Sequence, residues 1–431
     1  MPINEELHIR LDAFIKKAFP LLKGYLDSGE EVRQIYDDEY KVEPGGYSKT
    51  TVVKTLFFDF IHEHQEGLER LPEFSAVQEL IDKDAILSKH IGNLVGTRYG
   101  LMRQDLWDYL SYMLQRLIEV YYERKKFDEP VFQKMYDDLE KFIYRDTISV
   151  TDIIPLHNFS SEDDEIRFSD ELRIRRITDR EKEGFLKGAS FSGWPQHEMI
   201  HGNYVIELRH QMKKLFQGDT PTGGDPTIAK AIDNILIALR LFKQGNVGYN
   251  LIESKHDLDI RAFIGGTRSG FLFQRFIGNE YVLKRQDVKP LVEFYKSIPF
   301  DLVTKEKGID LAIRRLGYAY ERLKHEDKVI DLMIAYEAAF FRQGESGEQR
   351  HKLAVRVARL LKHNFDERKD MFREIKKFYD KRSDLVHASE STTPADLDKM
   401  EEYLRSSLKV FLRKIEEGKK HEDIIFELDL A

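Results

Sequence analysis

The spacing of apolar residues changes twice along the chain and divides it into three parts. Residues 1–145 follow the three-to-four-residue spacing of helices. Residues 146–300 mix short alternating segments, typical of half-buried strands, with helical segments. Residues 301–431 return to an almost purely helical pattern. The pattern therefore predicts a mainly α protein with a mixed α/β middle domain.

The first part, residues 1–145, is predicted to be a helical domain of unknown function. Its strongest stripe lies in segment 101–122 and consists of Leu106, Leu110, Met113, Leu114, Leu117 and Val120. The segment Glu43–Tyr47 contains one proline and two glycines and is predicted to interrupt the early helices. No residue of this part suggests chemistry.

The middle part, residues 146–300, is predicted to be a mixed domain with a sensing or regulatory role. Alternating segments predict strands, and apolar residues every three or four positions predict helices. The strands are expected at 146–150, 171–177 and 203–209, and the helices at 228–242 and 281–297. Residues 217–226 form the strongest loop signal, and the turn-like 265–270 between two apolar runs predicts a hairpin.

The last part, residues 301–431, is predicted to be an antiparallel bundle of four or five helices. Its most regular apolar stripe consists of Leu397, Met400, Leu404, Leu408, Phe411 and Ile415. This helix has a start signal in the sequence, because Thr393 suits the N-cap, Pro394 the first helical position and Asp396 the first turn.

Composition excludes several kinds of chemistry. The chain has no cysteine, which rules out disulfides, thiolate catalysis and cysteine-ligated metals. Its start is polar and no apolar run has the length of a membrane span, so we expect a cytoplasmic protein without a membrane partner. The net charge is −8, yet residues 352–382 hold 11 basic and 5 acidic residues. This basic stretch supports a phosphate-bearing partner, and a solvated helix face is the alternative and commoner explanation of such a charge run.

Arg382 and His387 follow that stretch and form the first candidate site. Histidine transfers protons near neutral pH, and arginine binds phosphate, so the two can cleave RNA without a metal. The bare spacing is weak, because about two or three such pairs occur by chance. Arg356 with His363 is a second example. Five residues of ideal helix also leave the two side chains about 140° apart. Convergence requires a helix end, a distortion or a partner subunit.

The second candidate site is His197-Glu198-Met-Ile-His201, which has the spacing of a zinc protease motif. On a helix the two histidines would bind zinc, with Glu198 as general base. Pro195 precedes the motif and a strand-like segment follows it, which leaves barely one helical turn. Glu207 or His210 would have to serve as third ligand. A loop that enters a strand is the alternative interpretation.

Three blocks in the C-terminal part resemble the HEPN superfamily, and most closely its Apea-like branch. The blocks are Asp331–Phe340, residues 344–361 and Tyr379–Ala388. The last block is similar to the family's tyrosine, Arg-Ser, apolar positions and His-Gly. Here Ala388 replaces the usual glycine, and Asp384 stands inside the motif. The resemblance covers about residues 305–420.

The resemblance implies a helical bundle that dimerises and, in active members, cleaves RNA at the dimer interface. It assigns His387 to proton transfer and Arg382 to the scissile phosphate. By position, Ser383 would orient one of them, and Glu337 would fix the arginine or the imidazole tautomer. No metal or other cofactor is required. The candidate RNA contacts are the basic residues Arg356, Arg359, Lys377 and Lys381.

These features lead to two main hypotheses. The first is a metal-independent endoribonuclease, a homodimer through its C-terminal bundle, which acts as a toxin or effector in prokaryotic antiviral defence. A phage-derived trigger is one candidate signal. The second is a non-catalytic dimerisation or nucleotide-binding module of HEPN type, in which Arg382 and His387 are structural. The zinc protease at His197, Glu198 and His201 is the third.

Overall fold

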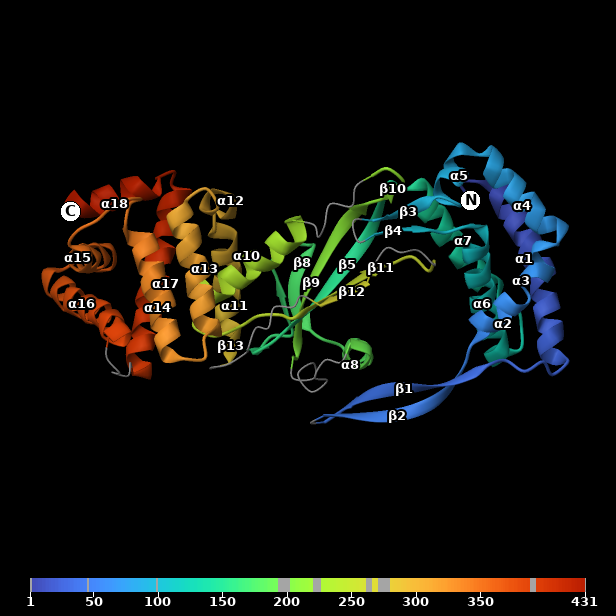
Figure 1. Cartoon of the computed structure of the whole chain (residues 1–431), viewed down its shortest axis with the longest axis horizontal. Coiled ribbons are helices and arrows are strands. Elements are labelled where there is room, and N and C mark those ends of the chain that lie inside the picture. Colours follow the sequence, from blue (N-terminus) through green and yellow to red (C-terminus); the bar gives the residue numbers. More distant parts are fainter. Residues whose placement is uncertain are drawn as a thin grey trace.

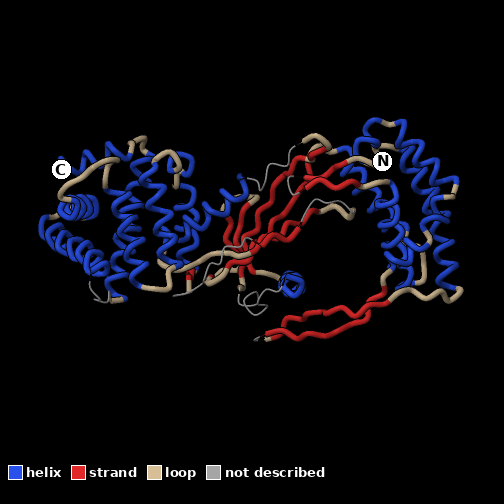
Figure 2. Tube along the Cα trace, in the orientation of Figure 1, coloured by secondary structure: helices blue, strands red, loops and turns tan. Residues whose placement is uncertain are grey.

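The computed structural model shows an elongated molecule in which three parts follow one another in chain order (Figure 1). It describes residues 2–44, 46–97, 100–192, 202–219, 226–260, 266–269, 280–387 and 393–430, with only the backbone at 100, 188–192, 226–227, 266–269 and 383–387. Helices form both ends, and an antiparallel sheet lies between them (Figure 2). The protein is mainly α with a mixed middle part, as the sequence predicts.

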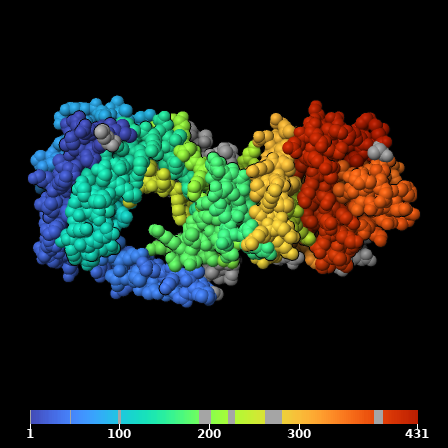
Figure 3. All heavy atoms as spheres, turned by 180° about the vertical axis from the view of Figure 1, so that it is seen from behind, coloured from blue at the N-terminus to red at the C-terminus, as the bar shows by residue number. Residues whose placement is uncertain are grey.

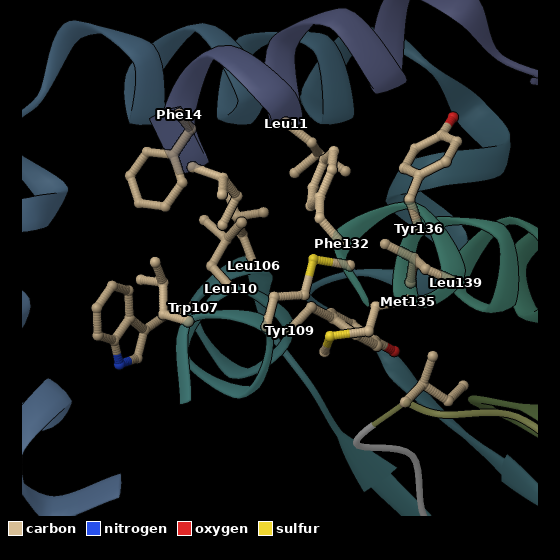
Figure 4. Close-up of a cluster of buried hydrophobic side chains, with 14 of the residues drawn as sticks. Leu11, Phe14, Leu106, Trp107, Tyr109, Leu110, Phe132, Met135, Tyr136 and Leu139 are labelled. Carbon is tan, nitrogen blue, oxygen red and sulfur yellow. The ribbon is translucent and has the colours of Figure 1, made fainter. Parts of the chain in front are cut away.

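The N-terminal part packs its helices around one apolar core. The elements are α1 (Glu5–Asp27), β1 (Gln34–Glu43), β2 (Gly46–Thr55), α2 (Phe57–Glu63), α3 (Gln65–Glu69), α4 (Pro72–Lys83), α5 (Ala85–His90), β3 (Leu94–Thr97), β4 (Gly100–Arg103), α6 (Leu106–Arg124) and α7 (Glu129–Tyr144). Leu106 and Leu110 of the predicted stripe face Leu11 and Phe14 of α1 in this core (Figure 4).

The prediction of a purely helical N-terminal part is wrong at residues 34–55. Here β1 and β2 pair over ten residues in antiparallel register, from Gln34 opposite Thr55 to Glu43 opposite Gly46. The predicted break at 43–47 is therefore the connection of a hairpin. We call this hairpin, β1 with β2, the arm. A second, short hairpin joins β3 and β4.

The middle part is a six-stranded sheet with the order β12-β11-β5-β9-β8-β7. The described elements are β5 (Thr147–Leu156), β6 (Phe159–Ser161), β7 (Glu165–Arg167), β8 (Leu172–Arg176), α8 (Asp179–Ser192), β9 (Tyr204–Lys213), β10 (Leu215–Phe216), α10 (Pro226–Phe242), β11 (Leu251–His256), β12 (Gly266–Ser269) and β13 (Tyr281–Leu283). The predicted strands at 146–150, 171–177 and 203–209 are confirmed, as is the helix at 228–242.

Two predictions for the middle part need correction. Residues 266–269 form strand β12, which pairs with β11 and is not a turn. Residues 281–283 form β13, parallel to β6, so the helix predicted at 281–297 starts only at Arg285. Apolar and polar residues alternate only briefly in both segments, and the partner of β13, strand β6, lies far away in the sequence. The remaining residues between 261 and 279 lie outside the described ranges.

The C-terminal part consists of packed helices, which we call the C-terminal helices. They are α11 (Arg285–Ser297), α12 (Phe300–Val303), α13 (Lys307–Glu321), α14 (His325–Phe340), α15 (Gln349–Leu361), α16 (Phe365–His387), α17 (Pro394–Glu416) and α18 (His421–Leu430). The start of α17 is confirmed: Thr393 is its N-cap and accepts a hydrogen bond from the backbone N–H of Asp396. No helix in the described ranges is long and apolar enough to cross a membrane.

A buried lysine joins the N-terminal helices to the sheet. Lys214 follows β9 and is 3% exposed, and its Nζ donates to the carbonyl oxygen of Ile143 (3.0 Å) at the end of α7. Nζ also lies 2.8 Å from Nε2 of His90. Burial lowers the pKa of Lys214 to about 8 and that of His90 to about 4. Nε2 of a neutral His90 accepts a hydrogen bond from Lys214, while the bonds from Nζ to the carbonyl oxygens of Phe142 and Ile143 close the last turn of α7.

The arm reaches across from the N-terminal helices and rests on α8 and the sheet. Tyr40 is 6% exposed and belongs to a small apolar cluster with Phe185, Leu186, Val205, Ile153, Ile177 and Leu251. Beside it, Lys187 donates to Asp37 (2.5 Å), which also contacts Lys54 (2.8 Å). These two hydrogen bonds lower the pKa of Asp37 to about 2. The apolar cluster around Tyr40 and the ion pairs of Asp37 therefore contribute to holding the arm against α8 and the sheet.

We expect Tyr40→Ala to release the arm, because the substitution removes the main apolar contact, of about 1.5–3 kcal/mol. Since the chain has no native cysteine, spin labels at Thr50→Cys on the arm and Arg180→Cys on α8 report their separation. The distance distribution should broaden in Tyr40→Ala. Tyr36→Ala is the matched control, since Tyr36 is 82% exposed on the same strand. A narrow distribution in Tyr40→Ala would show that the ion pairs hold the arm.

Candidate functional site

The apolar stripe of α16 determines where Arg382 lies. Met371, Ile375 and Phe378 are buried against the C-terminal helices, and Arg382 continues their four-three-four spacing. Residues at this spacing share one face of a helix. Arg382 is therefore on the inward face of α16, close to the end of the helix.

The arginine forms an ion pair there with the predicted acidic position. Nη1 of Arg382 donates to Oε1 of Glu337, which α14 presents toward α16. The side chains are 34% and 24% exposed, so the pair lies at the boundary between the core and solvent. Two of the candidate catalytic residues, far apart in the sequence, are thus brought into contact within one chain.

Tyr379 lies beside this pair, one turn earlier on α16. Its hydroxyl donates to Oε1 of Gln349 on α15 (3.2 Å). Burial raises the pKa of Tyr379, and the negative charge of Glu337 adds to the increase, while Arg382 acts against it. The phenol therefore stays neutral at physiological pH. It links α15 and α16 next to the arginine.

His387 is the last residue of α16, and the helix does not end between Arg382 and His387. An unbroken helix turns by about 500° over five residues, which leaves the two side-chain directions about 140° apart. The helix end that could have brought the pair together is therefore absent. The side chains of Ser383 and His387 and the whole of Ala388 lie outside the described residues.

The prediction of an RNA contact at Arg356 is wrong, because the side chain is interior. It is 2% exposed, the largest fully buried side chain among the described residues. Its guanidinium donates to Glu345 (2.7 and 2.8 Å), to Asp429 (2.7 and 2.9 Å) and to the carbonyl oxygen of Phe340 (2.7 Å). Arg356 therefore links α15 to the end of α14 and to α18 by hydrogen bonds.

The other three predicted RNA contacts differ in whether their side chains are exposed or already bound within the protein. Arg359 donates to the carbonyl oxygens of Leu428 (2.6 Å) and Asp429 (3.0 Å) in α18. Lys381 pairs with Asp396 in the first turn of α17. Lys377 alone among the four predicted contacts has an exposed side chain. Much of the basic stretch 352–382 thus serves the packing of the C-terminal helices.

Glu401 is a further buried charge in these helices that was not predicted from the sequence. Glu401 on α17 is 0% exposed and pairs with Lys328 on α14. Burial raises the pKa of this carboxyl, against the attraction of Lys328. Only the position of Glu401 next to Met400 in the apolar stripe could have suggested an inward direction. The contact holds α17 to α14 on the core side.

The zinc motif His197, Glu198 and His201 lies outside the described residues. Its two candidate third ligands are both engaged elsewhere. Glu207 is 4% exposed and accepts from Arg173 and Arg175, and Nε2 of His210 is 3.0 Å from Asp152. Among the described residues, no group of three or more histidine, aspartate or glutamate side chains could hold a metal ion.

Comparisons with known proteins give no relative for this chain. No family model matches it, and neither a curated protein nor a solved structure matches it.

We expect Arg356→Met to destabilise the fold by about 3–5 kcal/mol, because it leaves the carboxylates of Glu345 and Asp429 without their buried partner. The control is Arg373→Met on α16, whose side chain is 61% exposed in a surface pair and should contribute at most about 1 kcal/mol. Urea unfolding followed by circular dichroism measures both. Equal midpoints for the two variants would contradict the anchoring role of Arg356.

The same contact makes stability depend on pH. Hydrogen bonds from Arg356 lower the pKa of Glu345 to about 2, from 4.5. A carboxyl with a lowered folded pKa stabilises the fold above its unfolded pKa and loses this effect as the pH falls toward the folded value. The difference in urea midpoint between wild type and Glu345→Gln should therefore shrink between about pH 5 and about pH 3. A constant difference would mean that Glu345 does not titrate in this way.

Proposed function

We propose that the C-terminal helices form a metal-independent endoribonuclease of HEPN type that acts as a homodimer. The observation that supports this most is the Arg382–Glu337 ion pair, whose side chains are 34% and 24% exposed near the end of α16. His387 is the last residue of the same helix. The pair presents a guanidinium at the surface of the C-terminal helices. The three resembling blocks meet at this place.

The chemistry would use each residue in a defined role. His387 would accept the proton of the ribose 2′-hydroxyl or return one to the leaving oxygen. Arg382 would bind the scissile phosphate and stabilise the charge that develops on it. Glu337 would hold the guanidinium in place, and the phosphate would compete with this carboxylate for the N–H groups. Ser383 would orient the phosphate or the imidazole.

The geometry of α16 supports a site that is completed by two copies. Within one chain, Arg382 is on the inward face and His387 lies about 140° around the helix. Two copies that meet at the ends of their α16 helices can bring the histidine of one toward the arginine of the other. The proposed enzyme is therefore active as a dimer and inactive as a monomer.

A non-catalytic module is the second candidate, and one observation favours it. Glu337 already neutralises Arg382, as in a purely structural ion pair. In that case the C-terminal helices would dimerise or bind a nucleotide without cleaving it. The resemblance further suggests a toxin or effector in antiviral defence, and this role belongs to the first candidate alone.

We expect the purified protein to cleave total RNA in the presence of EDTA, with the activity lost by about 100-fold or more in His387→Ala, as for removal of a general acid–base. Arg382→Ala should cause a comparable loss. Growth of cells that express the wild type should be impaired and should recover with either variant. Cleavage products on a gel and colony counts are the two measurements.

Two matched controls separate a catalytic from a structural effect. Arg373→Ala on α16 and His325→Ala on α14 both change exposed residues of the same type and should leave cleavage unchanged. All variants are compared by thermal melting. If His387→Ala and Arg382→Ala fold normally and cleave RNA like the wild type, the ribonuclease assignment is wrong. If no protein cleaves RNA, the non-catalytic module gains support.

A further inference from the structure

One face of the six-stranded sheet is covered at one end only. Ile153, Val205 and Leu251 point from this face into the cluster that α8 and the arm cover. Side chains two residues on along each strand point to the same side. Toward the N-terminal helices, the same face continues along β5, β9 and β11 with side chains that are exposed or half exposed.

The strand register arranges these side chains in three rows. In the first row Thr151 lies between Arg209 and Lys255. In the second row Gln211 lies opposite Ser149, and the amide donates to the hydroxyl (2.7 Å). The third row pairs Lys213 with Thr147. We call these seven residues the basic patch.

The basic patch contains three cations, three hydroxyls and one amide, and no carboxylate. The acids lie in the next row, where Glu207 contacts Arg209 (2.9 Å) and Glu253 contacts Lys255 (2.8 Å). Both basic side chains remain open to solvent, with 58% and 47% exposed. Lys213 forms no ion pair with any described residue. The seven residues thus carry three positive charges, of which Arg209 and Lys255 each have one carboxylate partner outside the patch.

The patch faces an enclosed space. Figure 3 shows an opening through the molecule, bounded by the N-terminal helices, the arm and the middle part. The arm closes this ring, because its tip contacts α8 and the same sheet face at Val205. The basic patch lies on that face between the arm contact and the N-terminal helices, so it lines the opening from the side of the sheet.

We propose that the basic patch binds the phosphate backbone of the RNA strand that the C-terminal helices cleave. This inference rests on the proposed function. The occupant is a single RNA strand that passes along the sheet face within the ring formed by the arm. The middle part then holds the substrate, while the cleavage site lies on the C-terminal helices.

The chemistry of the patch favours a polyphosphate chain. Adjacent strands are about 4.8 Å apart, which places the Cα atoms of Arg209 and Lys255 about 10 Å from each other. Cations at such intervals neutralise successive phosphates, and hydroxyl and amide side chains bind phosphate and sugar oxygens between them. A protein partner would instead be anchored by large apolar side chains in the contact, and the patch offers it no apolar residue.

The test measures RNA binding apart from cleavage. The full chain with His387→Ala is titrated with a fluorescent single-stranded RNA of about 20 nucleotides in EDTA, and binding is followed by anisotropy. Adding Arg209→Gln, Lys213→Gln and Lys255→Gln should weaken binding at least about 10-fold at moderate salt. The slope of log K against log salt should fall by about 2, since each lost phosphate contact on a single strand contributes about 0.7.

The charge-matched control replaces Lys16, Lys83 and Lys289, which are 57%, 71% and 87% exposed on other elements, by glutamine. It should bind RNA within about two-fold of the parent, because it alters net charge but no contact. Equal affinities of the patch variant and the control would overturn the inference. So would a parent protein that binds polyglutamate but not RNA. If the patch variant loses binding while the wild type cleaves no RNA, the binding inference stands and the ribonuclease assignment fails.

Discussion

The pairing of β5 with β9 is the constraint on which the rest of the structure depends. The two strands pair over ten residues, and their ends lie in different cores. Ile148 and Val150 belong to the core of the N-terminal part, whereas Ile154 and Leu156 belong to the core around α10. Because a slip of one residue would turn both ends to the wrong face, each core stabilises the register that the other requires. Between them, Asp152 is fully buried and accepts from Ser254 (2.5 Å), as a buried polar group must.

The same principle connects the sheet to the C-terminal helices. On α10, Ile232 and Leu239 pack on the sheet, while Ala238 and Leu241 belong to the core of the C-terminal helices. One helix thus contributes two stripes to two cores. The N-terminal part shares its core with the ends of β5 and β9, and its arm makes a second contact with the middle part through the small cluster around Tyr40. The connection toward the C-terminus is therefore made by two shared cores, whereas the contact that closes the ring is small.

The structural features that were predicted correctly depend on contacts between residues close together in the sequence. The features that were missed depend on contacts between residues far apart in the sequence. The start of α17 followed from Thr393, because an N-cap is a local hydrogen bond. In strands β5 and β9, apolar and polar residues alternate clearly where one face is exposed. The arm was missed because Tyr40, its one buried residue, packs on residues far along the chain. Arg356 was taken for a surface residue because its partners Glu345 and Asp429 come from a loop and from the last helix. The predicted contact of Arg382 with Glu337 came from the resemblance and not from periodicity.

Two arginines of the C-terminal helices, Arg356 and Arg382, differ in how exposed they are and in how many partners they bind. Arg356 is 2% exposed and bound by two carboxylates and a carbonyl, so any anion that approached it would have to break the anchor of α18. Arg382 has one carboxylate partner and is 34% exposed. Ion pairs at such a boundary contribute about 0–1 kcal/mol, because water and salt screen them. A phosphate that carries two negative charges in the transition state can take the place of Glu337 at Arg382. This exchange does not disturb the core, because Glu337 is hydrated again when it is released. The guanidinium of Arg382, in a weak boundary pair, is therefore more available to an anion than that of Arg356, which the buried cluster holds.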